Sequence, residues 1–391
     1  MTIIITILLA LAVIYLDYKA YRKLIAQPPH RAVKYSFIAV VAISYLMILL
    51  TPIFMYFVIN EENCSYMMKT SMIFLTTYLL LSIPRLIFYI FWLPTKRRQW
   101  IWAGAAVSSI VLITFLYSVF ITRTDYEVKR VQIAYKNLPA SFDGYKLVFI
   151  SDIHTGSMIT PSDDISEIVG IINSLGADAV LFGGDIINVH HSELSSSVLN
   201  ELLRLKARDG VYAVLGNHDT GAYIKNSNKG KREANITNLV AKMESAGWVV
   251  LRDSTEYICR GNDSIAITGI DYGENLLEYK HSMDAVNGVN LNSIYNNVPD
   301  SVFNITISHL PQLWHSLCDG GYSDLTLSGH IHSMQIKIAG LSPAALMYDE
   351  WTGLYSREKG KLYINDGIGC VGYLARVGAR PEITVIELKC E

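Results

Sequence analysis

The chain has 391 residues, of which 51% are hydrophobic and 17% are charged, and its formal net charge is -2. A near-neutral chain lacks the basic excess of a general nucleic-acid-binding protein, so no nucleic-acid partner is expected. The hydrophobic fraction is high for a wholly soluble enzyme, and the apolar excess lies in the first third of the sequence. We therefore expect a membrane-embedded N-terminal region followed by a soluble domain.

Four apolar segments in residues 1–122 are long enough to cross a bilayer, and they lie at about residues 2–16, 35–59, 71–93 and 101–121. The first is the shortest. It is read as an uncleaved span rather than a signal peptide, because it has neither a basic start nor an obvious small-residue cleavage site. The third contains Arg85, which a membrane tolerates when the side chain faces other helices, water or a lipid headgroup. Both a contact inside the helix bundle and a contact with lipid phosphate fit this pattern.

Basic residues beside the spans predict the orientation, because Lys and Arg stay preferentially on the cytoplasmic side. The loops after the first and third segments hold eight of them and the remaining flanks four, namely Lys19, Arg22, Lys23, Arg31, Lys34, Lys96, Arg97 and Arg98 against Lys69, Arg123, Lys129 and Arg130. This bias predicts a multi-pass protein of the cytoplasmic (inner) membrane with both termini outside. Residues 123–130 would form a short tether, and residues 131–391 a domain on the outer, periplasmic or extracellular side.

The predicted domain alternates apolar strands with amphipathic helices, and similar polar residues recur where strands end. The strand at residues 146–150 is the first example. Five strand ends deliver, in order, Asp152 and His154, Asp185, Asn217 and His218, His309, and His330 and His332. Ligand sites commonly form where strands open into loops at one rim of a sheet. Carboxylate and amide oxygens mixed with imidazoles suit Mn, Fe or Zn, and a set too large for one ion predicts two divalent metal ions.

These strand ends resemble the five signature blocks of the calcineurin-like metallophosphoesterase family. The blocks follow the family's order, which is Asp-x-His, Gly-Asp, Gly-Asn-His-Asp, a lone His after an apolar strand, and Gly-His-x-His. The resemblance covers roughly residues 132–388, and the flanks at 138–144 and 378–383 resemble a bacterial membrane-associated branch of the family. It implies an α/β four-layer sandwich, in which two mixed β-sheets pack face to face and helices lie outside.

The resemblance also implies a role for each strand-end residue. One metal ion would be held by Asp152, His154, Asp185 and His332, and the other by Asp185, Asn217, His309 and His330. Asp185 would bridge the two ions, and His218 would contact the scissile phosphate or protonate the leaving oxygen. Two adjacent divalent ions lower the pKa of a bridging water, polarise a phosphoryl oxygen and align an in-line attack, which are the needs of phosphoester hydrolysis.

Three further residues are candidates for the site. Asn188 stands where several branches of the family carry an aspartate that orients the catalytic histidine, and its amide can accept a hydrogen bond without supplying negative charge. Arg376 and Arg380 are candidates for a bidentate phosphate clamp, with a structural ion pair as the alternative. The apolar segment at residues 343–353 either caps a lipid-like group or packs in the core or against a membrane.

The sequence thus predicts a membrane-anchored, dinuclear-metal-dependent phosphoesterase. Its substrate would be a phosphomonoester, phosphodiester or diphosphate near the membrane, with lipid-linked phosphoesters and membrane lipids among its partners. Two alternatives stay open, namely a UDP-2,3-diacylglucosamine pyrophosphatase-like enzyme facing the cytoplasm and a non-catalytic metal-binding sensor or scaffold on the same fold. The full ligand set and His218 favour catalysis, because a non-catalytic protein has no need to keep them.

Overall fold

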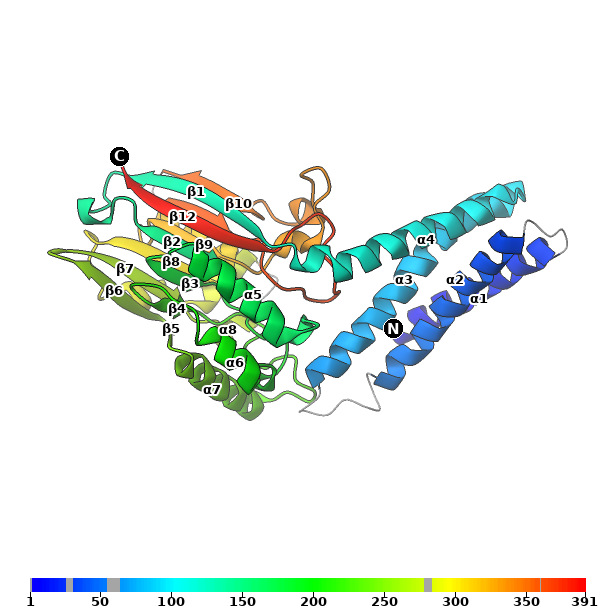
Figure 1. Ribbon diagram of the computed structural model, residues 1–391, viewed down its shortest axis with the longest axis horizontal. Helices are drawn as coiled ribbons and strands as arrows, with labels where there is room; N and C mark the ends of the chain where they lie inside the picture. Colours follow the sequence, from blue (N-terminus) through cyan, green and yellow to red (C-terminus); the bar gives the residue numbers. More distant parts are fainter. Residues whose placement is uncertain (1, 26–30, 55–63, 278–282, 359) are drawn as a thin grey trace. The chain divides into compact units, whose positions relative to one another are not determined.

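The computed structural model of the chain describes residues 2–25, 31–54, 64–277, 283–358 and 360–391. The chain divides into two compact units (Figure 1). The first consists of helices and extends to Phe120, and the second contains all the strands and extends from Ile121 to Glu391.

The first unit is built from α1 (Thr2–Ile25), α2 (Arg31–Pro52), α3 (Cys64–Thr95) and α4 (Gln99–Phe120). Three stretches are long and apolar enough to cross a membrane, namely Lys34–Pro52, Met68–Thr95 and Gln99–Thr124. They correspond to the second, third and fourth predicted segments, except that residues 55–59 lie outside the described residues. Among the described residues, α1 is not one of these stretches. Charged residues fill the second half of α1, namely Asp17, Lys19, Arg22 and Lys23, so its apolar part is short. Four spans were expected and three are supported.

Arg85 of α3 is fully buried within this unit. Its guanidinium donates to the carboxylate of Asp17 at 3.2 Å and to the hydroxyl of Ser44 at 3.0 Å. The hydroxyls of Tyr45 and Tyr89 donate to the same carboxylate. A buried charge is tolerated where it is paired and hydrogen-bonded, so this network explains how α3 accommodates an arginine. It favours the contact inside the helix bundle over a contact with lipid phosphate.

The second unit contains two six-stranded mixed sheets. The first has the order β1 (Glu127–Tyr135), β12 (Glu382–Cys390), β2 (Lys146–Ile150), β3 (Ala179–Phe182), β4 (Val211–Ala213) and β5 (Trp248–Val250). The second has the order β10 (Gly353–Arg357), β11 (Gly360–Ile364), β9 (Leu325–Ser328), β8 (Phe303–Ser308), β7 (Asp263–Ile270) and β6 (Ser254–Arg260). Strands β2 to β5 are mutually parallel, and so are β7, β8, β9 and β11. The carboxyl ends of parallel strands lie on one edge of their sheet, and it is there that the predicted ligands are placed.

The alternation of side chains along β2 separates two apolar layers. Leu147 and Phe149 pack between the two sheets, whereas Val148 and Ile150 pack toward helices on the outer face. Those helices are α5 (Pro161–Ser174), α6 (Ser196–Leu202) and α7 (Lys229–Ser245), and Figure 1 shows α5 lying over the first sheet. The shorter α8 (Glu274–Leu277) and α9 (Leu291–Tyr295) follow β7, and α10 (Trp314–Asp319) packs against β11. This is the α/β arrangement with two mixed sheets that the sequence predicted.

The first strand begins inside residues 123–130, the range that was predicted to be a tether. Strand β1 starts at Glu127 and pairs in parallel with β12 from that residue on. Tyr126 and Val128 pack against the core, which explains why these residues join the domain. Before them, the guanidinium of Arg123 contacts the carboxylate of Asp164 on α5 at 3.0 Å. The chain is therefore held to the domain from this point, not from residue 131.

Candidate metal centre

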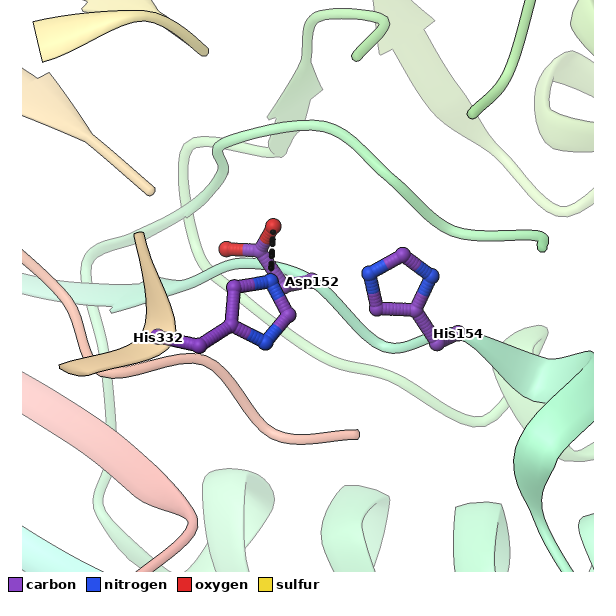
Figure 2. Close-up of side chains that lie close together, drawn as sticks. All are labelled: Asp152, His154 and His332. Atoms are coloured by element: carbon purple, nitrogen blue, oxygen red, sulfur yellow. Dashed lines mark ion pairs between the residues drawn. The ribbon is translucent and has the colours of Figure 1, made fainter. Parts of the chain in front are cut away.

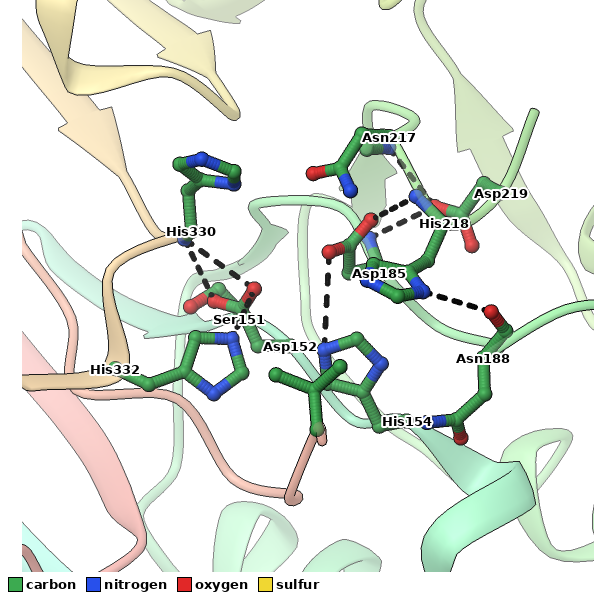
Figure 3. A network of polar contacts seen from close by, with 12 residues as sticks. Ser151, Asp152, His154, Asp185, Asn188, Asn217, His218, Asp219, His330 and His332 are labelled. Atoms are coloured by element: carbon green, nitrogen blue, oxygen red, sulfur yellow. Dashed lines mark hydrogen bonds and ion pairs between the residues drawn. The ribbon is translucent and has the colours of Figure 1, made fainter. Parts of the chain in front are cut away.

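The predicted ligands converge in two groups at the carboxyl edges of the two sheets (Figure 3). One group is Asp152, His154 and His332, and the other is Asp185, His309 and His330, and within each group the ligand atoms lie within 4.8 Å of one another. Asn217 adjoins the second group, because its amide oxygen lies 3.1 Å from Nε2 of His309. Strands from both sheets thus contribute to each group.

The first group contains a ligand nitrogen, Nε2 of His154, that has no hydrogen-bond partner (Figure 2). Nε2 of His332 lies 2.7 Å from Oδ1 of Asp152. Nδ1 of His154 lies 3.2 Å from the carbonyl oxygen of Ile187, which can only accept, so this nitrogen carries the proton. Nε2 of His154 then presents a lone pair, and it is buried without a hydrogen-bond partner, 3.7 Å from Oδ2 of Asp185. A divalent cation would satisfy such an arrangement.

The second group repeats this design. Nδ1 of His309 donates to the carbonyl oxygen of Gly183 at 2.8 Å, which leaves Nε2 facing Oδ2 of Asp185 at 3.2 Å. Nδ1 of His330 lies 3.2 Å from the same Nε2. Metal-binding histidines typically donate their other nitrogen to a backbone carbonyl in this way, which fixes the tautomer. The donor set of both groups therefore fits two divalent cations.

Burial and neighbouring charges set the protonation of these imidazoles in opposite directions. Burial lowers the pKa of His154 well below its usual value and that of His330 to about 3, so both rings are neutral and able to bind a cation. Burial also acts to lower the pKa of His309, but the carboxylates of Asp185 and Asp152 outweigh it and raise that pKa to about 9. A cation at Nε2 of His309 would take the place of this proton.

Sharp backbone turns aim the ligands at one another. The φ angle is positive at Asp152 (53°), His154 (47°), Asp185 (59°), His330 (73°) and His332 (54°). Each such left-handed residue costs roughly 1 kcal/mol or more unless it is glycine, and strain of this kind clusters at functional sites. Glycine is required where the loops pass the carboxylates, since a Cβ at Gly329 would lie 2.3 Å from Oδ2 of Asp152.

His218 lies beside the two groups, with its ring perpendicular to that of His154 at a centroid distance of 4.9 Å. Its Nδ1 donates to the main-chain carbonyl oxygen of Asn188 at 2.7 Å, and its ring stacks on Tyr223. This contact places the proton on Nδ1 and leaves Nε2 for a ligand. Asn188 thus contacts the histidine through its backbone, whereas its side-chain amide donates to the hydroxyl of Ser157 at 3.2 Å.

The two arginines predicted to clamp phosphate are used elsewhere. Arg376 is fully buried and donates to the carbonyl oxygens of Gly369 at 2.8 Å and Asp366 at 2.9 Å. Arg380 forms a surface ion pair with Asp125 at 2.7 Å, which is the structural alternative given above. Neither arginine lines the cavity at the metal ligands.

That cavity has a volume of about 480 Å³. Its floor carries Asp185, Asn217, His218, His330 and His332. Its walls are largely aliphatic and aromatic, with Ile331, Met334, Ile336, Pro343, Tyr348, Val371 and Tyr373 among them. None of the described residues that line it is Lys or Arg. The site therefore combines a polar, metal-binding floor with apolar walls.

Asp219 had no role in the sequence analysis, although it ends the Gly216-Asn217-His218-Asp219 block. Its carboxylate is fully buried and accepts four backbone N–H groups. Oδ2 accepts from Asp185 at 2.7 Å and Gly216 at 2.9 Å, and Oδ1 accepts from Ile186 at 3.0 Å and Ile187 at 3.2 Å. Asp219 thereby joins the loop after β3 to the loop after β4. Its place in the block, directly after His218, was the available signal.

Two mixed sheets with paired His and carboxylate groups at their carboxyl edges define a dinuclear metal-binding domain. Residues 145–334 match the calcineurin-like phosphoesterase family, and this part of the chain belongs to that family. The family assignment agrees with the resemblance seen in the sequence.

The chain is similar in sequence to three proteins that contain or are named for this kind of domain. A Danio rerio protein named transmembrane protein with metallophosphoesterase domain is 31% identical over 270 residues, which are 67% of this chain and 57% of that protein. The metallophosphoesterase YkuE of Bacillus subtilis is 28% identical over 260 residues, 64% of this chain and 82% of that protein. The UDP-2,3-diacylglucosamine pyrophosphatase LpxG of Chlamydia muridarum is 25% identical over 304 residues, 69% of this chain and 87% of that protein. The chain thus spans little more than half the length of the Danio rerio relative. Its apolar helices and this transmembrane relative together indicate a membrane protein.

Replacing Asp219 by Asn should destabilise the domain, because the amide NH₂ group would face two of the four N–H donors. A buried N–H group left without an acceptor costs about 1–3 kcal/mol, so for two such groups we expect a loss of about 3 kcal/mol. For a domain of this size that lowers the melting temperature by about 6–12 °C. Circular dichroism of the detergent-solubilised chain would measure it. Asp319→Asn, at an exposed position, is the matched control, and equal melting of both variants would contradict the role of Asp219.

Proposed function

We propose that the chain is a membrane-anchored phosphoesterase that uses two divalent metal ions to hydrolyse a phosphoester or diphosphate near the membrane. The observation that carries the proposal is the pair of ligand groups on either side of Asp185, with His218 beside them. A binding protein would need the ligands but not an additional imidazole directed into the same cavity. A sensor or scaffold on this fold is therefore less well supported.

The two groups assign residues to two ions. Asp152, His154 and His332 would hold one, and Asn217, His309 and His330 the other. Oδ2 of Asp185 lies 3.7 Å from Nε2 of His154 and 3.2 Å from Nε2 of His309, so its carboxylate is placed to bridge. Mn, Fe and Zn all suit this mixture of oxygen and imidazole donors. Ions bound here would supply an acidified water and positive charge for the phosphoryl oxygens.

The residues around the ions have separate tasks. His218 is held by its Nδ1–H to the carbonyl oxygen of Asn188, so its Nε2 can contact the phosphate or deliver a proton to the leaving oxygen. Its backbone N–H donates to Oδ1 of Asp185 at 2.8 Å, which couples its position to that of the bridging carboxylate. The apolar walls limit the access of water to the floor.

Replacing Asp185 by Asn should reduce bound metal from about two equivalents per chain to at most one, because the bridging charge is lost. The amide oxygen still accepts the hydrogen bond from His218, so the loop has a partner in the variant. Elemental analysis of the purified full-length chain would measure metal content, with Asp319→Asn as the control. Retention of two equivalents would show that Asp185 does not bridge.

Replacing His218 by Asn should leave metal content near that of the unmodified chain and lower turnover by roughly a hundredfold or more, the scale for loss of an acid or a transition-state donor. The hydrolysis of p-nitrophenyl phosphate and bis(p-nitrophenyl) phosphate by the Mn-loaded chain would be followed. His315→Asn is the control, since that ring lies outside the cavity and contacts Glu350 and Arg357. Unchanged turnover in the His218 variant would remove this residue from the mechanism.

We further propose that the catalytic domain faces the outer side of the cytoplasmic membrane. The eight basic residues that follow the first and third predicted segments, against four on the other flanks, support this orientation. The proposed orientation of the catalytic domain does not depend on whether α1 crosses the membrane, because the basic residues predict a cytoplasmic position for the segment between α1 and α2 with or without that crossing. Three crossings by the remaining candidate spans then carry the chain outside.

The second candidate is a pyrophosphatase of UDP-2,3-diacylglucosamine in the cytoplasm, which the similarity to LpxG brings forward. Such a substrate carries a diphosphate and a nucleoside. The described residues that line the cavity include no Lys or Arg to bind a second phosphate, so the cavity favours a single phosphoryl group with an apolar remainder. The two candidates also require opposite sides of the membrane.

The labelling of a native cysteine can show on which side of the membrane the domain lies. Cys259 on β6 is free and exposed, so a membrane-impermeant maleimide should label it in intact cells if the domain lies outside. Exposed Cys390 would be replaced by Ser to leave a single exposed thiol in the domain, and Cys64 by Ser because it is the one cysteine of the sequence that precedes the domain. The further change Cys259→Ser, which should abolish labelling, is the control. Labelling only after lysis would place the domain in the cytoplasm and make the pyrophosphatase the leading candidate.

A further inference from the structure

Residues 336–348, which we call the apolar wall, have apolar side chains on two opposite sides. Ile336, Pro343 and Tyr348 line the cavity above the metal ligands. The other side exposes Ile338 (62%), Leu341 (75%), Leu346 (90%) and Met347 (66%) to solvent. Large apolar side chains gathered on one short exposed segment mark an interaction surface.

The backbone of the apolar wall is held firmly, so these side chains are displayed by a defined structure. Ile338 and Leu341 exchange two backbone hydrogen bonds of 2.9 and 3.0 Å, and Pro343–Leu346 form a 3-10 turn. The hydroxyl of Ser342 donates to the carbonyl oxygen of Ser333 at 2.6 Å. Ala344 is fully buried beneath the turn.

The apolar wall lies on the side of the domain where the chain arrives from the membrane. The backbone N–H of Lys337 donates to the carbonyl oxygen of Val377 at 2.8 Å. The hydroxyl of Thr122 donates to the carbonyl oxygen of the preceding residue, Arg376, at 2.6 Å. Thr122 itself belongs to the candidate span Gln99–Thr124. Neighbouring residues therefore bind both the apolar wall and the residues that follow α4.

The connection from α4 to the domain is short. The chain runs from the end of α4 at Phe120 to the start of β1 at Glu127, a path of at most about 25 Å even when fully extended. The ion pair between Arg123 and Asp164 fixes part of that path to the domain. A surface held there has the membrane as its nearest apolar phase.

We propose that the apolar wall inserts into the bilayer surface, and that the substrate is a phosphoester whose apolar part enters the cavity along the wall from the lipid phase. This inference rests on the proposed function and names its substrate class. The inner side chains of the wall continue the apolar lining down to the metal-binding floor, so one surface leads from the membrane to the ligands. A single phosphoryl group suits the floor, because no described lining residue is a Lys or Arg.

Insertion of the apolar wall depends on apolar contact and not on attraction to anionic lipid. Lys337, its one basic residue, is engaged by the carboxylate of Asp366 at 3.1 Å. Asp349 and Glu350, directly after the wall, add negative charge. Docking should therefore be insensitive to salt, whereas binding through basic residues would weaken as salt screens it.

Docking is tested on the full-length chain in nanodiscs. An environment-sensitive fluorescent amino acid would replace Leu346, and in a control protein Leu203, an exposed leucine at the end of α6. Dibrominated phosphatidylcholine should quench the probe at position 346 about twofold or more and leave the probe at 203 unchanged. An unquenched probe at 346 would overturn docking. If the emission of the probe at 346 is not quenched but shifts to the blue, and this shift grows with the number of chains per disc, the result would overturn docking and favour contact with a second copy of the chain.

The substrate class is tested with one headgroup in two forms, namely long-chain phosphatidic acid in the disc and soluble dihexanoyl phosphatidic acid. We expect the double substitution Leu346→Gln and Met347→Gln to lower hydrolysis of the long-chain form about tenfold and to leave the soluble form unchanged. Leu203→Gln should change neither. An equal effect on both forms, or hydrolysis of the soluble form alone by the unmodified chain, would overturn the lipid substrate. If neither form nor p-nitrophenyl phosphate is hydrolysed, the proposed function fails, while the quenching result still decides docking.

Discussion

The metal centre depends on the buried carboxylate of Asp219, which does not line the cavity and acts only on the backbone of the ligand loops. Asp219 accepts backbone N–H groups from two loops that follow different strands, and in doing so it fixes the distance between Asp185 on one loop and Asn217 and His218 on the other. Burial and the neighbouring charge of Asp185 raise the pKa of Asp219 to about 8, and the four N–H donors offset only part of that cost. Once the two loops are held, the side chains of Asp185 and His218 keep fixed positions relative to one another. The second sheet then needs only to bring His309, His330 and His332 to the same edge.

Much of this arrangement could be predicted because its signals are local. The apolar run of β2 and the helical spacing in α5 each fix an element within a few residues, and every predicted ligand follows a strand end. Parallel pairing then brings those ends together without further information. The prediction of two metal groups needed only the order of residues and the fact that parallel strands point the same way.

The features that could not be predicted depend on tertiary contacts or on backbone angles. Nothing in residue identity shows that Asp152 and His332 adopt left-handed φ angles, which the surrounding loops must impose. The orienting contact to His218 comes from a carbonyl group that every residue possesses, so examining the Asn188 side chain could not reveal it. Arg376 was a candidate for a phosphate clamp, with a structural role as the alternative, and its Nε and Nη1 donate to backbone carbonyls of the surrounding loop. Asp17 of α1 is likewise explained only by its pairing with Arg85, and the early start of β1 by the packing of Tyr126 against the core.

The short path from α4 to β1 changes how the reaction should be measured. A domain joined to a membrane span by so few residues cannot diffuse away from its bilayer, so it would meet any membrane-borne substrate by lateral motion in two dimensions. Its rate on such substrates is then set by their mole fraction in the membrane, and adding inert lipid would slow the reaction even when the amounts of enzyme and substrate in the tube stay the same. Kinetic constants expressed per volume would differ from one vesicle preparation to another, whereas constants expressed per membrane area would agree.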